Sequence, residues 1–508
     1  MRHQLFATKS LRQLLDEMAG ENRLRRVLGP VQLTSLGVGA IIGAGIFVAT
    51  GAAARNVAGP ALMLSYVVAG VTCIFAALCY AEFASMVPVA GSAYTYAYAT
   101  LGELFAWIIG WDLILEYAVG SATVANGWSG YFQSVLAKLG LHVPAALAGP
   151  SIIYDTAAGQ FVRTAGVVNL PAVLIVALVT AVLVKGIQES AGFNTTMVFL
   201  KVTVVIFVIL VGAFYIKPEN WTPFAPYGIT GLSFFGRPLL GQVNAAGEPV
   251  GMLAGAAIIF FAYIGFDSVS THAEEAKQPT RDVPIGIIAS LLICTVLYIA
   301  VVAVLTGMVR YDRLSVDAGV SDAFKQAGLP WAELIIAAAG VAGITSVLLV
   351  LMLSAPRVFL AMARDGMVPF GFFGAVHPKF RTPWKSTILI GAFVAVLTGL
   401  LPIDALLRLT NIGTLFAFLI VCAAVLIMRQ TNPDAGRPFR APLYPFVPIA
   451  GIFACLLLMF SLPVENWYRL FVWMAIGLVI YFSYSYKHSE LRKRREAASA
   501  ASGGARRG

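Results

Sequence analysis

The apolar residues of this chain are grouped in long runs, and most polar residues fall between these runs. A helix needs roughly 20 predominantly apolar residues to cross a bilayer. Twelve runs approach this length, starting near residues 31, 60, 104, 170, 192, 251, 284, 332, 386, 405, 444 and 467. The pattern predicts an all-α integral membrane protein with twelve transmembrane helices in a domain of residues 31–486.

Two of these runs are interrupted at matching places, by residues 37–47 and by residues 260–267. A break inside a span frees backbone N–H and C=O groups that lipid cannot satisfy. Such a break survives only where protein packs around it or where it lines a polar cavity. Paired broken helices in the two halves of a transporter mark a substrate site. We therefore expect a solute to bind where the two breaks meet.

Composition supports a membrane location. Of the 508 residues, 59% are hydrophobic and only 12% are charged, and the mean hydropathy is +0.82. A soluble protein of this length would carry about twice that share of charged residues. These values exclude an ordinary soluble globular fold.

The basic residues set the predicted orientation. The net charge is +10, and Lys and Arg gather in residues 1–30, in residues 487–508 and in short segments between runs. The positive-inside rule places both tails in the cytoplasm, and twelve spans put them on the same side of the cytoplasmic membrane. Residues 487–508, rich in Ala, Ser, Gly and Arg, are expected to form a disordered tail. Because no basic face is interleaved with aromatic residues, nucleic-acid binding is not expected.

The first five runs and the next five can be superimposed, because each set opens with an interrupted helix. Five spans is an odd number, so two such sets must have opposite orientations in the membrane. This predicts two inverted repeats, residues 31–216 and 251–429. Residues 444–486 would then add two further spans.

At the first break, Gly43 and Gly45 allow the backbone to unwind and a ligand to approach closely. The helical segment that begins near Ile46 presents free N–H groups, which favour a carboxylate. The alternative is simple helix packing, because Gly39 and Gly43 form a small-xxx-small pair.

At the second break, Phe261, Ala262 and Ile264 offer carbonyl groups at the end of a half-helix, which favours an ammonium group. An α-amino acid carries both groups on one carbon, so the two breaks together are complementary to it. Asp267 follows the break. It is either an N-cap or a group that binds an ion or a proton.

Two further ionisable positions lie deep in apolar runs. Lys201 falls about 14 Å into the fifth run, close to the middle of the bilayer. Glu116 shares a helix face with Asp112 in the third run. Intramembrane ionisable residues indicate function by default, so Lys201 and Glu116 are candidates for proton coupling. A structural ion pair, or a hydrogen-bonded carboxyl group that joins helices, is the alternative for each.

Other chemistry finds little support in the sequence. The cysteines show no spacing that suggests zinc, and neither a metal nor another cofactor is expected. The segment at residues 127–130 resembles the Gly-x-Ser-Gly of intramembrane serine proteases. However, all five histidines lie in tails or near span ends, so we do not expect an enzyme.

The chain resembles the amino acid–polyamine–organocation superfamily, and within it bacterial homologues of the cationic amino acid transporters. The resemblance covers about residues 25–488. The motifs that carry it are GAIIGAGIF (39–47), YAEFA (80–84), GSAYTY (91–96), GWDLILEY (110–117), FAYIGFD (261–267), PR (356–357), ARDG (363–366) and TNIGTL (410–415).

The resemblance implies a LeuT-type fold of five plus five inverted spans. It places the substrate carboxylate on the N–H groups of Gly43, Ala44 and Gly45. It places the amino group on the carbonyl groups of Ile41, Phe261, Ala262 and Ile264. Lys201 matches a lysine that replaces a sodium ion in proton-coupled relatives. Many relatives have Ser or Thr where this chain has Ala44, so only backbone contacts carry over there.

From these features we expect a secondary active amino acid permease, coupled to protons, whose partners are an amino acid, protons and the bilayer. An amino acid or amine antiporter, and a non-transporting amino acid sensor on the same fold, remain alternatives. The apolar stretch at residues 347–352 favours neutral amino acids over cationic ones. The substrate and the oligomeric state are left open by the sequence.

Overall fold

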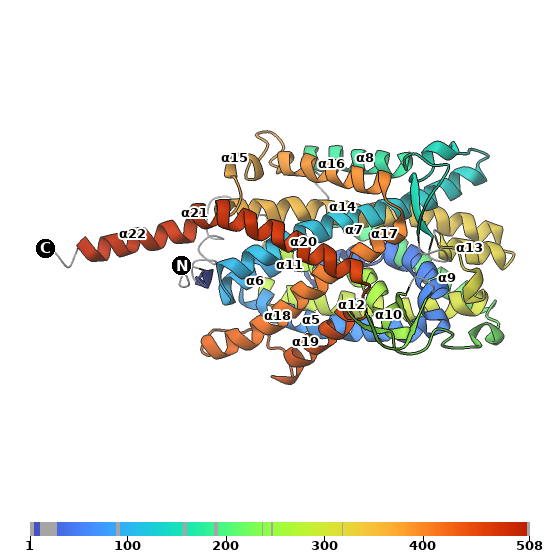
Figure 1. The fold of residues 1–508 in the computed structure, drawn as a ribbon, viewed down its shortest axis with the longest axis horizontal. Coiled ribbons are helices and arrows are strands. Elements are labelled where there is room, and N and C mark those ends of the chain that lie inside the picture. The colour runs from blue at the N-terminus through green and yellow to red at the C-terminus, as the bar shows by residue number, and fades with distance from the viewer. Residues whose placement is uncertain are drawn as a thin grey trace.

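The computed structural model of this protein describes residues 5–10, 28–87, 92–155, 160–186, 191–235, 237–244, 247–316 and 318–504. Most of the segment 1–30 therefore lies outside the described residues, as does Gly91 of the GSAYTY motif. The helices are α3 (Pro30–Ile41), α4 (Thr50–Ala53), α5 (Leu62–Met86), α6 (Ser92–Thr100), α7 (Glu103–Lys138), α8 (Leu170–Lys185), α9 (Ala191–Ala213), α10 (Met252–Ile259), α11 (Ser268–Thr271), α12 (Pro279–Met308), α13 (Gly319–Gln326), α14 (Pro330–Arg364), α15 (Phe370–Phe373), α16 (Trp384–Leu400), α17 (Ile403–Leu409), α18 (Ile412–Thr431), α19 (Phe446–Met459), α20 (Val464–Ile480), α21 (Tyr486–His488) and α22 (Glu490–Gly504) (Figure 1).

The helices form a membrane-spanning bundle, as the apolar pattern predicts. Eight helical stretches of the described chain are long and apolar enough to cross a membrane, and one of them, Pro30–Met86, contains two of the predicted runs. Three shorter apolar helices, α8, α16 and α19, match further predicted runs. The all-α membrane fold is confirmed, whereas the count of twelve spans stays a prediction.

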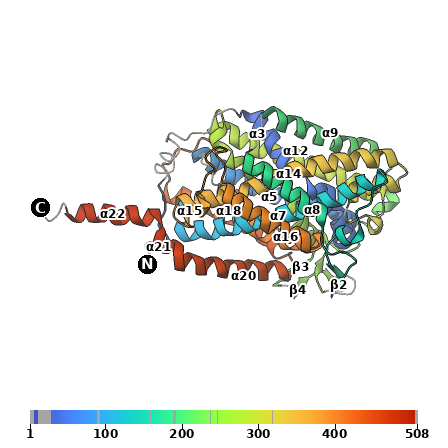
Figure 2. The ribbon, with the colours of Figure 1, turned by 90° about the horizontal axis from the view of Figure 1, so that it is seen from above.

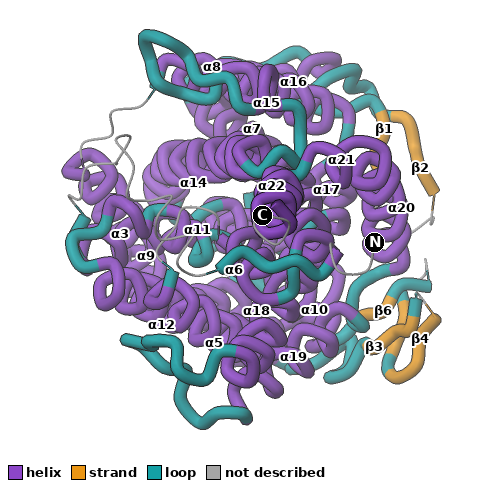
Figure 3. The backbone as a smooth tube through the Cα atoms, turned by 90° about the vertical axis from the view of Figure 1, so that its left-hand side faces the viewer, coloured by secondary structure: helices purple, strands orange, loops and turns teal. Residues whose placement is uncertain are grey.

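Long helices pack in pairs across the bundle. Helix α5 lies against α12, α7 against α14, and α8 against α16. The pair α8 and α16 lies on one side of the bundle in two views (Figures 1 and 3). Each pair joins a helix of the first predicted repeat to the corresponding helix of the second.

The ends of α8 show how local sequence sets a helix boundary. The side chain of Asn169 accepts a hydrogen bond from the backbone N–H of Ala172, and a proline follows in the first turn. At the other end Gly186 has φ +84°, a conformation that glycine adopts without strain. The boundaries of this span are therefore encoded by its flanking residues.

The two long connections contain short strands at the end of the bundle away from the termini (Figure 2). The first holds β1 (Ile152–Asp155) and β2 (Gln160–Arg163), and the second holds β3 (Leu232–Phe234), β4 (Arg237–Leu240), β5 (Gln242–Val243) and β6 (Pro249–Val250). Among its described residues each connection also has a 3₁₀ turn, Ala145–Leu147 in the first and Pro218–Trp221 in the second. The described residues of these connections thus combine β-hairpins with 3₁₀ turns.

The C-terminal tail differs from the prediction. Residues 490–504 form helix α22, which extends away from the bundle (Figure 1), whereas we expected disorder. Alanine has a high helix propensity. Ion pairs Arg492–Glu496 and Lys493–Glu490 connect successive turns. These local features favour a helix despite the low apolar content.

Both terminal segments contact the same end of the bundle. Lys9 forms an ion pair of 2.5 Å with Asp365, which follows α14. Ser489 donates a hydrogen bond to Glu103 at the start of α7. The two tails therefore lie on one side, as an even number of spans requires.

Candidate functional site

Both predicted interruptions are present. Helix α3 ends at Ile41, Ile42 is extended, and a π-helical turn, Gly45–Ala49, begins the second half. In the other run, α10 is followed by a 3₁₀ turn, Phe260–Tyr263, an extended Ile264 and then α11. Gly265 has φ +124°, which only glycine adopts easily. The unwound residues are the ones that the sequence singled out.

The two breaks lie against each other. A Cβ atom built on Gly45 would approach to 3.1 Å from the backbone nitrogen of Ala262, and closer still to its Cα. A Cβ atom on Gly43 would instead lie 3.1 Å from Cβ of Val347 on α14. The two glycines therefore allow close packing in different directions, toward the second break and toward α14.

Lys201, on α9, covers the end of α3. Its Nζ donates to the carbonyl oxygens of Gly39 at 2.8 Å and Ile42 at 3.2 Å, and the residue is 2% exposed. These carbonyl groups belong to the C-terminal turn of α3, which carries the negative end of the helix dipole. The lysine thus compensates the negative end of the first break.

The positive end of the first break has no such partner. The first N–H groups of a helical segment lack intrahelical acceptors. Within the described part of the chain, no side chain caps the turn that starts at Gly45. The N–H groups of Gly43, Ala44 and Gly45 lie at this end, where an anion is favoured.

Whereas Lys201 compensates the negative end of the first break, Asp267 compensates the positive end of the second. Its Oδ1 accepts from the N–H of Gly265 at 3.2 Å, and its Oδ2 accepts from the hydroxyl of Tyr117 at 2.8 Å. The residue precedes α11, but its side chain makes no capping hydrogen bond to that helix. The N-cap interpretation is therefore wrong, because the carboxylate is directed at the unwound linker and at α7.

Tyr298, on α12, connects the carbonyl groups of both breaks. Its hydroxyl lies 2.7 Å from the oxygen of Ile41 and 3.1 Å from the oxygen of Ala262. A single hydroxyl hydrogen can serve only one acceptor at a time. Sequence analysis missed this residue, since a tyrosine in an apolar run gives no signal of its own.

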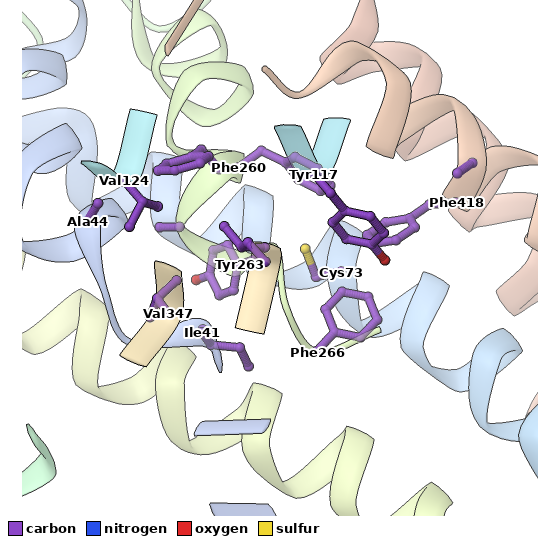
Figure 4. Close-up of a cluster of buried hydrophobic side chains, with 14 of the residues drawn as sticks. Ile41, Ala44, Cys73, Tyr117, Val124, Phe260, Tyr263, Phe266, Val347 and Phe418 are labelled. Atoms are coloured by element: carbon purple, nitrogen blue, oxygen red, sulfur yellow. The ribbon is translucent and has the colours of Figure 1, made fainter. Parts of the chain in front are cut away.

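Apolar side chains surround the two breaks. Figure 4 shows Ile41, Ala44 and Val347 in one cluster of buried hydrophobic side chains with Phe260 and Tyr263 of the second break. A Cβ atom on Gly120 of α7 would lie 3.7 Å from Leu351 and 3.9 Å from the ring of Phe261. The surroundings of the breaks are thus largely aliphatic and aromatic.

Glu116 belongs to a separate buried cluster on α7. Arg469 of α20 forms an ion pair with Glu116 Oε1. The backbone N–H of Asn411 and the hydroxyl of Thr414 each lie 3.3 Å from Oε2. Sequence analysis missed Arg469, although an arginine inside the last apolar run is itself a signal of function.

His272 lies directly after α11, where its surroundings disfavour a protonated ring. Burial of the ring, and then the nearby charge of Arg357, lower the pKa of His272 to about 3. Its Nδ1 lies 2.9 Å from the carbonyl oxygen of Ser268, and its Nε2 lies 3.4 Å from Arg357 Nη1. This geometry assigns the hydrogen to Nδ1 of a neutral ring.

The site has no features of a metal centre. Among the described residues, no group of three or more His, Cys, Asp or Glu side chains is placed to hold a metal ion. The groups gathered at the breaks are backbone N–H and C=O groups, one lysine, one aspartate and two tyrosine hydroxyls. This arrangement can bind and orient a small dipolar solute.

Comparison with known proteins agrees with this architecture. The model of a family described as "Amino acid permease" matches residues 28–481. The chain is 47% identical to the branched-chain amino acid permease BcaP of Bacillus subtilis (strain 168), over 97% of this chain and 100% of that protein. It is 44% identical to the methylthioribose transporter of the same organism, over 96% of this chain and 99% of that protein. It is 37% identical to the vacuolar cationic amino acid transporter 4 of Arabidopsis thaliana, over 83% of this chain and 66% of that protein.

Proposed function

The chain belongs to the amino acid permease family, and from this premise we propose that it transports neutral aliphatic amino acids, those with branched side chains among them, by proton symport. The protein is a multi-pass membrane permease and not an enzyme. The substrate class, the proton coupling and the residues that bind the substrate form the proposal.

The observation that carries the proposal is the pattern of compensated and uncompensated helix ends. Lys201 neutralises the negative end of the first break, and Asp267 neutralises N–H groups at the second. What remains without a charged partner is a positive end at Gly43, Ala44 and Gly45, beside a negative end at Phe261, Ala262 and Ile264, where neutral donors, the N–H of Ile264 and the hydroxyl of Tyr298, contact the first two carbonyl oxygens. An α-amino acid offers a carboxylate to the former and an ammonium group to the latter.

The side-chain preference follows from the surroundings of the breaks. The neighbours on α14 and α7 are Val347, Leu351 and Gly120, and the second break contributes Phe261. A cationic side chain would need a carboxylate or several carbonyl groups there. An aliphatic side chain needs only apolar contact, which is worth about 0.8 kcal/mol per buried CH₂ group. We therefore place neutral amino acids ahead of cationic ones.

Proton coupling rests on Lys201. Its ammonium group occupies the space between α9 and the first break, where it would repel a sodium ion. Loss of its proton would weaken its hydrogen bonds to the carbonyl groups of Gly39 and Ile42, because a neutral amine is a poorer donor than an ammonium group, and so alter the first break. Glu116 and Asp267 are the other proposed participants, since both are buried carboxyl groups linked to the breaks.

The proposed topology is a LeuT-type fold with inverted repeats at residues 31–216 and 251–429 and two extra spans at 444–486. The pairing of α5 with α12, α7 with α14 and α8 with α16 supports it. The basic residues near the two tails support a cytoplasmic location for both termini and insertion in the cytoplasmic membrane.

One relative suggests a second candidate substrate. The methylthioribose transporter is named for a neutral sugar that has neither an α-carboxylate nor an α-ammonium group. Such a ligand would leave both uncompensated helix ends without a charged partner. We therefore place it second to an amino acid.

Uptake by purified protein in proteoliposomes tests the proposal. Labelled leucine should accumulate under an inward proton gradient and ignore an inward sodium gradient. Counterflow without any gradient separates exchange from symport, and unlabelled lysine and methylthioribose serve as competitors. Sodium-driven uptake, or inhibition by methylthioribose but not by leucine, would contradict the proposed function.

A further inference from the structure

Three ionisable side chains are buried together at the junction of α7, α18 and α20, outside the amino acid site. Asp112 and Glu116 are 1% and 4% exposed, and the side chain of Arg469 is 9% exposed. Arg469 lies about 8 Å along the axis from the first residue of α20, well inside the span. Charges at this depth are costly unless they are balanced.

Indole groups hold α20 firmly against α7. Trp111 donates to the carbonyl oxygen of Trp473 at 2.9 Å, and Trp473 donates to that of Trp111 at 2.8 Å. Their rings stack with centroids 4.3 Å apart. Trp107 adds a hydrogen bond of 2.9 Å to Gly477. The extra span therefore presents Arg469 to α7 in a fixed register.

The carboxyl groups of Glu116 and Asp112 differ in their hydrogen-bond partners. Glu116 receives donors from Arg469, from the N–H of Asn411 and from the hydroxyl of Thr414. Neither oxygen of Asp112 has a hydrogen-bond partner in the described part of the chain. Hydrogen bonds to the charged form favour ionisation. The surroundings thus hold Glu116 as a carboxylate and leave Asp112 without support for a charge.

Gly413 of α18 brings the two carboxyl groups together. A Cβ atom built there would lie 2.5 Å from both Asp112 Oδ1 and Glu116 Oε1. Of the described charged side chains, Arg469 is the one that contacts this pair, while α18 contributes only the uncharged Asn411 and Thr414. Two carboxylates and one guanidinium would leave a buried net charge, whereas one bound proton makes the cluster neutral.

Arg469 has N–H groups that are available to bind a second carboxylate. Its Nε and Nη1 are buried without a partner in the described chain. Carboxylate pairing by a guanidinium uses such parallel N–H groups. If Asp112 lost its proton, its carboxylate would offer the acceptor that these donors lack.

The cluster is connected to the second break by Asn411. This residue has φ +88°, and its side chain donates to the carbonyl oxygens of Ala257 and Ile258 at 2.9 Å each. Those carbonyl groups belong to the last turn of α10, directly before the break. A change at Glu116 would therefore reach the break through the backbone N–H of Asn411.

We propose that Asp112, Glu116 and Arg469 form a second proton-binding site, which holds one proton on Asp112 in this conformation. When that proton leaves to water, Arg469 shifts toward the new carboxylate of Asp112 and weakens its pairing with Glu116. Asn411 transmits the shift to α10. The site is distinct from the amino acid site and depends on the proposed function only for what the proton drives.

Infrared difference spectroscopy on purified protein tests the proton directly. The parent should show a carbonyl-stretch band of a protonated carboxyl group that disappears at alkaline pH. Asp112→Asn, which keeps the shape of a neutral carboxyl group, should lose this band and still unfold cooperatively. The matched control is Glu333→Gln, because Glu333 is ion-paired with Lys138 at 2.6 Å; it should leave the band in place.

A second measurement follows the thermal midpoint against pH. The midpoint of the parent should fall as the pH rises above the range in which an unfolded aspartate ionises, because the folded protein keeps a proton that the unfolded chain has lost, and this fall should be shallower in Asp112→Asn. An unchanged band in Asp112→Asn, or a parent without any protonated-carboxyl band, would overturn the proposal. Neither measurement requires substrate, so failure here is separate from failure of leucine counterflow.

Discussion

The two broken helices have the same defect, but they are compensated by opposite charges. At the first break the lysine on α9 covers carbonyl groups of Gly39 and Ile42. At the second break Asp267 accepts a hydrogen bond from the N–H of Gly265. Side chains therefore compensate the negative end of one break and the positive end of the other.

This difference gives the site its polarity. Two unassisted breaks would each present a positive and a negative end, and a solute could bind in either direction. Here a charged side chain covers one end of each break, so that one positive and one negative end remain without a charged partner, the negative one contacted by the hydroxyl of Tyr298. The pair is complementary to a zwitterion in a single orientation, and each prediction below changes one part of this arrangement.

The largest effect is expected when the breaks are forced apart. In Gly45→Val the new side chain meets the backbone of Ala262, which cannot rotate away. Overpacking costs about 1–3 kcal/mol, so the affinity for leucine should fall about 5- to 140-fold. Thermal stabilisation by leucine is the measurement. Gly371→Val is the control, because a Cβ atom there meets nothing within 4 Å, and it should bind normally.

Variants at Gly43 test the same packing in a second direction, toward α14. The three atoms nearest to a Cβ atom at this position would all belong to the side chain of Val347. Gly43→Ala should therefore bind weakly, and Gly43→Ala with Val347→Ala should recover part of the affinity. Gly45→Ala should gain nothing from Val347→Ala, because its obstacle is the backbone of Ala262. Equal recovery in both pairs would argue against the packing described here.

Removal of the charge at the first break should be the next largest effect. Lys201→Ala leaves two buried carbonyl groups without their donor, at a cost of about 1–3 kcal/mol. We expect proton-driven accumulation to be lost in proteoliposomes, with some binding retained. Lys185→Ala, at the exposed end of α8, is the control. Full accumulation by Lys201→Ala would remove this lysine from the coupling mechanism.

Removal of the charged side chain at the second break should have a smaller effect than removal of Lys201. Asp267→Ala removes the acceptor of both the Gly265 N–H and the Tyr117 hydroxyl, whereas Tyr117→Phe removes one hydrogen bond. We expect a loss of stability of about 1–3 kcal/mol for the first variant and about 0.5–1.5 kcal/mol for the second. Denaturation of both variants and of the double variant measures the coupling. Additive losses would mean that the two residues act independently.

The smallest expected effect is at the tyrosine that joins the breaks. Tyr298→Phe removes the hydroxyl group that donates to the carbonyl oxygens of Ile41 and Ala262. Loss of this hydrogen bond costs about 0.5–1.5 kcal/mol. The affinity for leucine should change only a few-fold in a binding assay. Tyr468→Phe, at an exposed position of α20, should behave as the parent. A complete loss of binding in Tyr298→Phe would assign that hydroxyl a direct role.

Much of this architecture is readable from the sequence because it is local. Apolar runs predict the long helices, and a glycine-rich interruption predicts a break wherever it occurs. The ends of α8 follow from Asn169 and Gly186. The positions of both breaks were correct for this reason.

The remaining features depend on how distant segments pack. Arg469 and Glu116 are separated by 353 positions, and only the rotation of α20 against α7 brings them together. Tyr298 reaches the breaks because α12 packs against both α3 and α5. The direction of the Asp267 carboxylate was mispredicted because a capping position was inferred without knowledge of Tyr117. Such contacts carry no local pattern.

The central claim is that both α-groups of an amino acid are bound by the two helix ends that have no charged partner. The most direct measurement is competition for leucine binding by its deaminated analogue, 4-methylpentanoate, and by its decarboxylated analogue, 3-methylbutylamine. Loss of either group leaves buried backbone groups unpaired at a cost of about 1–3 kcal/mol, so each analogue should bind about 10- to 100-fold more weakly than leucine. Competition by either analogue at the same concentration as leucine itself would contradict the account.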